Sequence, residues 1–92
     1  MIMTASDVKE MIYDAICENS GSTEIKETDQ LIADLSMDSI DILETGLAIE
    51  RCLEDNLGRD IPLVIEDHLT SSSTVEDLVN YVLSKVQAYI EP

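Results

Sequence analysis

The sequence predicts an all-α protein, a small four-helix bundle with three major helices, one short third helix and a long loop between the first and second helices. Apolar residues recur three and four positions apart along three stretches, as in amphipathic helices. No stretch shows the alternation of a convincing strand. A length of 92 residues suits one small domain and is too short for two, so residues 1–92 are expected to form a single domain.

The first helix is expected at about 4–19, where Thr4 or Ser6 can cap its start and the run 19–21 stops it. Residues 20–38 then form a loop, and loops of this length are usually functional or packed by their own side chains. One helical turn is expected at 29–33. Three apolar residues are predicted to pin the loop to the core: Leu31, Ile32 and Leu35.

The second helix is expected at about 39–57, with Gly58 as its C-terminal stop. Gly46 in mid-helix costs about 1 kcal/mol relative to Ala. Its position indicates either close approach of a neighbouring helix or ligand, or simple tolerance of a small residue. Ile40 and Leu47 project on a flank among acidic residues. The predicted core face comprises Ile42, Leu43, Gly46, Ile49, Leu53 and Leu57.

The last third of the chain predicts two more helices. Pro62 disfavours helix at the residue before it, so the short third helix is expected only at about 65–69. A capping box from Ser73 to Glu76 predicts the start of the fourth helix, which is expected at about 74–89.

The charge excludes several functions. Twenty acidic and five basic residues give a net charge of -15, which repels nucleic acid and anionic lipid and attracts partners with basic patches. No apolar run approaches the length of a membrane span, and no signal peptide is evident. Cys17 and Cys52 have no metal-like spacing, so we expect reduced thiols in a cytoplasmic protein and no metal site.

The transition from loop to second helix is the most informative stretch. Asp38 is placed as an N-cap, and Asp41 adds negative charge to the first turn, where the helix dipole favours it. Ser39 is therefore expected at the first helical position with its hydroxyl facing solvent. The single histidine, His68, is not an expected catalyst, and no base is evident for Ser39. We therefore interpret Ser39 as a point of attachment in a protein that is not an enzyme.

A longer motif includes Asp34-Leu35-x-Met37-Asp38-Ser39-Ile40-Asp41, followed by Leu43-Glu44, Leu47-Ala48-Ile49-Glu50, Asp60-Ile61-Pro62 and a last helix beginning Thr74-Val75-Glu76. This motif resembles that of the acyl carrier protein family, and the resemblance covers most of the chain. It implies that Ser39 carries a 4'-phosphopantetheine arm, which a separate Mg-dependent synthase transfers from coenzyme A. The terminal thiol of this arm would hold acyl groups as thioesters. The resemblance implies that Asp38 assists metal binding in the transferase complex.

The resemblance also implies a monomer that serves several enzymes in turn. They are a phosphopantetheinyl transferase (the holo-carrier synthase), a ketoacyl synthase and other acyl-processing enzymes or acyltransferases with basic docking patches. The implied partner surface comprises Ile40, Asp41, Glu44, Leu47, Ala48 and Asp55.

The sequence departs from the family pattern. Ser36 stands where the family usually has Gly, Ile40 replaces Leu, Arg51 places a positive charge on a usually acidic helix, and the second helix is longer by about one turn. These departures favour a specialised carrier, for example in lipopolysaccharide acylation, over general fatty-acid synthesis. Two alternatives stay open: a carrier of polyketide or aminoacyl units, and an unmodified acidic helical adaptor.

Overall fold

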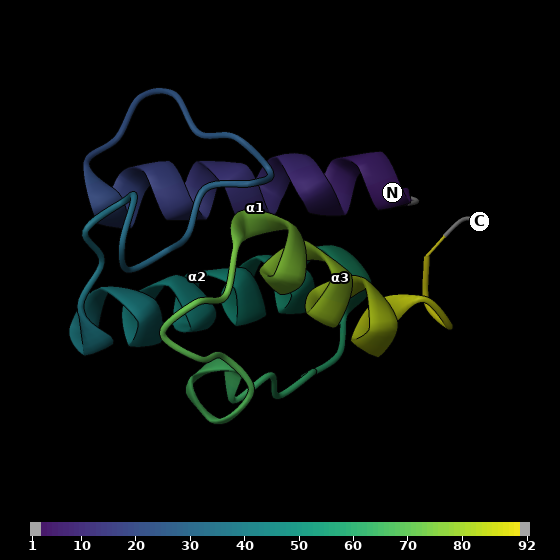
Figure 1. Cartoon of the computed structure of the whole chain (residues 1–92). Helices are drawn as coiled ribbons and strands as arrows, with labels where there is room; N and C mark the ends of the chain where they lie inside the picture. The colour runs from purple at the N-terminus through teal and green to yellow at the C-terminus, as the bar shows by residue number, and fades with distance from the viewer. Residues whose placement is uncertain (1–2, 91–92) are drawn as a thin grey trace.

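The computed structural model describes residues 3–90, and its frame is an antiparallel pair of helices, α1 (Ala5–Ser20) and α2 (Ser39–Leu57). Figure 1 shows the long loop that joins them at one end and α3 (Val75–Val86), which crosses the pair. Residues 58–74 run along α2 on the side away from α1 and include one 3₁₀ turn, η1 (Ile65–Asp67). The fold is all-helical over the described residues, with one isolated bridge between Gln30 and Thr74.

The prediction of a four-helix bundle is not confirmed, because residues 3–90 form three α-helices and a lone 3₁₀ turn. The third helix, expected at 65–69, does not develop. Val64 before it adopts a left-handed conformation with φ 46°, which cannot continue into a regular α-helix. The last helix ends at Val86, three residues earlier than expected, and closes in a turn where the Tyr89 N–H donates to the Val86 carbonyl.

Each α-helix begins with a capping box. Thr4 and Asp7 form the one on α1, and Gly21, with φ 76°, closes that helix in the left-handed conformation that glycine tolerates. On α3 the box pairs Thr74 with Asp77, one residue later than the predicted Ser73–Glu76 pair. Ser73 cannot serve as the cap because it is buried and its hydroxyl already accepts the Thr70 N–H at 2.8 Å.

The buried face of α2 is rotated from the predicted one. Leu43, expected in the core, is 44% exposed, whereas Thr45 is fully buried. The Thr45 hydroxyl donates to the Asp41 carbonyl at 2.7 Å, so burial leaves it satisfied. The face that packs inward lies three, four, seven and eleven residues along from its first member and consists of Ile42, Thr45, Gly46, Ile49 and Leu53.

The long loop is attached to the start of α3. The Leu31 N–H donates to the Ser73 carbonyl at 3.0 Å, and the Val75 N–H donates to the Asp29 carbonyl at 2.9 Å. Leu31 and Leu35 are buried as predicted, but Ile32 is 41% exposed. The expected helical turn is a hydrogen-bonded turn in which the Asp34 and Leu35 N–H groups both donate to the Gln30 carbonyl. This turn does not repeat as a regular helix does, so its side chains do not share one buried face, and Ile32 faces outward.

Residues 58–74 are held against the helices at Leu63. Its N–H donates to the Glu50 carboxylate of α2 at 3.2 Å, and its carbonyl accepts the hydroxyl of Tyr81 from α3. This clamp places Ile65 over Gly46, where an added Cβ would lie 3.0 Å from Ile65 Cγ1. Gly46 therefore reflects close approach of the η1 segment, and the absence of a side chain there is a packing requirement.

We predict that Gly46→Ala lowers the free energy of unfolding by about 1 kcal/mol, because overpacking against Ile65 outweighs the gain in helix propensity. In an Ile65→Ala background the same substitution should raise it by about 1 kcal/mol, since only the propensity gain remains. Urea unfolding of the four proteins measures both values. An equal effect in the two backgrounds would contradict the contact.

A second prediction concerns the clamp on Leu63. Burial, followed by the charges of Asp67, Glu50 and Glu66, raises the pKa of Tyr81 above its ordinary 10.0. The folded protein then keeps this proton to higher pH than the unfolded chain, so the free energy of unfolding falls as pH rises beyond about 10. Tyr81→Phe should lower that free energy by about 1 kcal/mol at neutral pH.

The Tyr81→Phe variant should also lose less stability between neutral and alkaline pH than the wild type. Denaturant unfolding at a series of pH values measures this, with Tyr13→Phe on α1 as the control. An unchanged alkaline loss in Tyr81→Phe would show that Tyr81 is not its source.

Candidate functional site

The site is built at the start of α2. The Asp38 carboxylate accepts the Asp41 N–H at 2.8 Å, and the Asp41 carboxylate accepts the Asp38 N–H at 3.1 Å. Met37, directly before the cap, is buried and holds the loop against the core. Ser39 is consequently the first residue of α2 and is exposed. The predicted cap at Asp38 and the predicted first helical position of Ser39 are therefore confirmed.

The approach to Ser39 is strained at Ser36. Ser36 has φ 56°, in the left-handed region that glycine adopts most easily. It stands at the position where glycine was the expected family residue. The chain thus adopts a left-handed conformation before the cap while carrying a side chain there.

The first turn of α2 leaves donors available. Asp38 satisfies the Asp41 N–H, and the Ile42 N–H donates to the Asp38 carbonyl at 3.0 Å. The N–H groups of Ser39 and Ile40 have no acceptor within residues 3–90. Such groups, at the positive end of a helix dipole, favour a phosphate or another anion.

A hollow of about 230 Å³ opens beside Ser39. One wall comes from Ile42 of α2, another from the exposed Ile32 of the long loop, and the third from Glu66 in η1 and residues 69–71 after it. Sequence reasoning missed this arrangement, because no local pattern shows that three distant segments meet. The residues around Ser39 include Ile32, Ile42, Glu66, Leu69 and Ser71.

The outer face of α2 carries the other predicted residues. Ile40 is 62% exposed and Leu47 is 47% exposed, and Leu43 joins them three residues after Ile40. Glu44 and Asp55 are exposed, and Ala48 is half-buried. Asp41 differs from the rest, because it is half-buried and its carboxylate is used in the cap.

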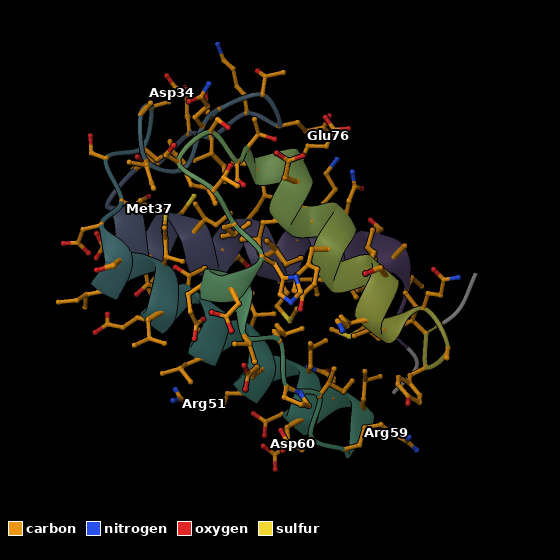
Figure 2. All side chains as sticks on the ribbon, turned by 60° about the horizontal axis from the view of Figure 1, so that its bottom comes forward. Asp34, Met37, Arg51, Arg59, Asp60 and Glu76 are labelled. Atoms are coloured by element: carbon orange, nitrogen blue, oxygen red, sulfur yellow. The ribbon has the colours of Figure 1, made fainter. Side chains whose placement is uncertain are left out.

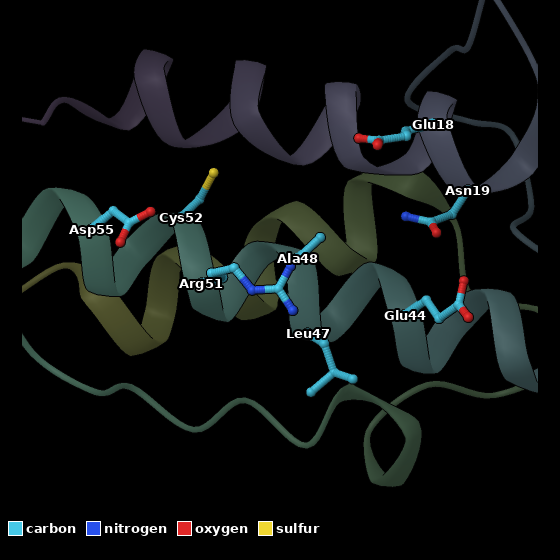
Figure 3. A pocket seen from close by; sticks show the side chains of 8 residues that line it. All are labelled: Glu18, Asn19, Glu44, Leu47, Ala48, Arg51, Cys52 and Asp55. Carbon is cyan, nitrogen blue, oxygen red and sulfur yellow. The ribbon is translucent and has the colours of Figure 1, made fainter.

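A groove of about 490 Å³ lies between the outer face of α2 and the end of α1 (Figure 3). Glu18 and Asp55 lie in the last turns of α1 and α2, and neither last turn holds a basic residue. The helix dipole disfavours a negative charge there by about 0.3–1 kcal/mol each. The residues that shape the groove include Glu18, Glu44, Leu47, Ala48, Arg51 and Asp55.

The few cations are mostly engaged. Lys9 pairs with Glu27, whose hydrogen bond and charge raise the pKa of Lys9. The Arg59 guanidinium lies 4.3 Å from the centre of the Tyr89 ring, and Lys85 lies 5.6 Å from that of Tyr81. Arg51 is exposed, and Figure 2 shows it projecting outward from α2.

The remaining chemistry offers little for catalysis. The His68 ring stacks on that of Tyr81, with 4.4 Å between the ring centres. No group of three or more His, Cys, Asp or Glu side chains is arranged to hold a metal ion in the described part of the chain. Among residues 3–90, the helices also lack the length and apolar character that a membrane crossing requires.

Comparison with known proteins identifies the class. A relative named acyl carrier protein from Wolinella succinogenes is 30% identical over 76 residues, which are 83% of this chain and 88% of the relative. Another of the same name, from a Sulfurovum species, is also 30% identical over 76 residues, 83% of this chain and 89% of its own length. No family model and no solved structure matches the chain.

The protein is therefore a carrier and not an enzyme. The chain belongs to the acyl carrier protein family. Membership implies, in general terms, a phosphopantetheine prosthetic group and acyl-processing enzymes as partners. It supports the hypothesis of a carrier over that of an acidic helical adaptor.

The cap on α2 yields a prediction. Asp38→Ala should lower the free energy of unfolding by about 1 kcal/mol, because the Asp41 N–H loses its acceptor. Asp38→Ser should retain most of the stability, since a serine hydroxyl can accept the same bond. Urea unfolding compares the two variants with the wild type. Equal losses in both would show that the carboxylate charge, rather than the cap, is responsible.

Proposed function

We propose that Ser39 is the attachment residue for 4'-phosphopantetheine and that the protein delivers acyl thioesters to enzymes of fatty-acid or specialised lipid biosynthesis. The observation that carries this proposal is the exposed Ser39 hydroxyl at the capped start of α2, beside a hollow with apolar walls. Ser39 needs no base of its own, because a separate transferase activates the hydroxyl.

The residues around Ser39 fit such a group. The free N–H groups of Ser39 and Ile40, at the positive end of the α2 dipole, would favour the negative charge of a phosphate diester on the Ser39 oxygen. When bound, the arm supplies a terminal thiol that holds acyl groups as thioesters. Ile42 and Leu69 offer apolar surface beside the attachment point.

Asp38 has two roles in this proposal. One carboxylate oxygen, Oδ1, accepts the Asp41 N–H and fixes the start of the helix. Its other oxygen has no hydrogen-bond partner within the described residues. That oxygen is free to assist the magnesium ion of the transferase while the cap stays formed.

The partner surface is the outer face of α2. Ile40 and Leu47 supply exposed apolar contacts, and the carboxylates around them attract basic patches and speed encounter. Transient docking suits a small apolar contact steered by charge better than a large apolar interface. The proposed surface comprises Ile40, Asp41, Glu44, Leu47, Ala48 and Asp55.

The proposal places a monomer in the cytoplasm, where it meets a phosphopantetheinyl transferase, a ketoacyl synthase and acyltransferases in turn. The free thiols of Cys17 and Cys52 are consistent with a reducing compartment. Arg51, Ser36 and the 19-residue α2 favour a dedicated pathway such as lipopolysaccharide acylation. A carrier of polyketide or aminoacyl units is the second candidate, because it needs the same attachment site.

The attachment site is tested by incubating the protein with coenzyme A, Mg²⁺ and a promiscuous phosphopantetheinyl transferase. The intact mass of the wild type should rise by the mass of one 4'-phosphopantetheine group. Ser39→Ala should show no gain, whereas Ser71→Ala, which alters the same hollow, should be modified fully. A wild type that stays unmodified with several active transferases would contradict the proposal.

The role of the Asp38 carboxylate is tested with the same assay. Asp38→Ser preserves a cap but removes the magnesium ligand, so the initial rate of modification should fall roughly tenfold or more. The variant's circular dichroism should match that of the wild type. An unchanged rate would show that Asp38 acts only as the helix cap.

The thioester recovered from the native host identifies the cargo. A 3-hydroxyacyl chain indicates lipid synthesis, and an amino acid indicates the second candidate.

A further inference from the structure

The groove between α1 and α2 has a charge pattern that the general acidity of the protein does not explain. Arg51 lies in it between the carboxylates of Glu44 and Asp55, with Glu18 on the facing end of α1 (Figure 3). Arg51 nevertheless forms no ion pair within residues 3–90, where the salt bridge present joins Lys9 to Glu27. Its guanidinium fork is therefore free to bind a carboxylate from outside.

The groove contains two negative charges that the dipoles of its own helices disfavour. Glu18 and Asp55 lie at helix C-terminal ends, where a negative charge opposes the dipole. Residues that oppose the local preference of a helix for positive charge at its C-terminal end are expected at functional surfaces. Leu47 and Ala48 add apolar contact area next to the charges.

We propose that this groove docks a basic helical segment of a partner protein that places one carboxylate against Arg51, with a cation on each side of it. The inference rests on the proposed function, which makes α2 a partner surface, and extends that surface to the end of α1. Arg51 is then the specificity-determining residue. It rejects partners that present only positive charge at this point, because like charges in contact are unfavourable.

The occupant follows from charge. With a net charge of -15, the protein repels a second copy of itself, nucleic acid and anionic lipid. The docking segment must therefore be basic, and the carboxylate that it places against Arg51 is the exception. Along α2 the distance from Glu44 to Arg51 is two turns and from Arg51 to Asp55 one turn, about 10 Å and 6 Å of axial rise. The complementary charges on a partner helix are therefore seven and four residues apart.

The test uses stapled helical peptides titrated into the isotope-labelled protein and followed by NMR. One peptide has the order Lys, Glu, Lys at these spacings with Leu between them, and the matched peptide has Lys at the central position. Both spacing orders are synthesised, to allow either direction of the helix. Arg51→Glu is compared with Lys26→Glu, which changes the net charge equally from the loop outside the groove.

We expect Arg51→Glu to weaken binding of the peptide with the central Glu by about fivefold and to strengthen binding of the all-Lys peptide by a similar factor. Lys26→Glu should strengthen both slightly. Amide shifts should map to Glu18, Asn19 and the outer face of α2. Equal effects of Arg51→Glu on both peptides, no binding, or shifts that depend on protein concentration alone (a second copy) would overturn the proposal.

Failure of this inference is separable from failure of the proposed function. Arg51→Glu lies outside the attachment site, so it should still gain one arm in the mass assay. Normal modification without the peptide preference would refute only the docking inference. Loss of modification in the wild type would refute the attachment itself.

Discussion

The reciprocal hydrogen bonds between Asp38 and Asp41 determine where α2 begins, and the rest of the site depends on that point. Ser39 is consequently the first helical residue and lies at the exposed start of the helix. Burial of Ile49 and Leu53 in the core leaves Ile40 and Leu47 exposed on the outer face of the same helix. Buried Met37 fixes the position from the loop side. The local cap thus sets where Ser39 is presented, and the packing of the core sets which residues form the outer face proposed for partners.

The second constraint is the clamp on Leu63, because it decides where residues 58–74 lie. Glu50 and Tyr81 hold its two backbone groups from α2 and α3, and Ile65 is then seated over Gly46. The same placement brings Leu69 and Ser71 to the hollow beside Ser39. The apolar surroundings of Ser39, the proposed attachment point, therefore come from segments that only the clamp and the loop contacts bring together.

Charge distinguishes this carrier from a uniformly acidic one. Lys9, Arg59 and Lys85 contact side chains of the same protein, whereas Arg51 stands among carboxylates without a partner in the described chain. The net charge of -15 attracts basic partners in general. One unpaired cation in the middle of an acidic groove can then discriminate among them.

The sequence by itself determined the three major helices, the stops at Gly21 and Gly58, the cap at Asp38 and the exposed Ser39, because local hydrogen bonds and the 3.6-residue period encode them. Only the tertiary structure decided that Thr45 rather than Leu43 is buried, that Ile32 faces outward and that η1 remains a single turn. It alone also brought the α1 end beside Arg51, and Glu66 and residues 69–71 beside Ser39. The physical reason is that these outcomes depend on contacts between residues far apart in the chain, which no local pattern specifies.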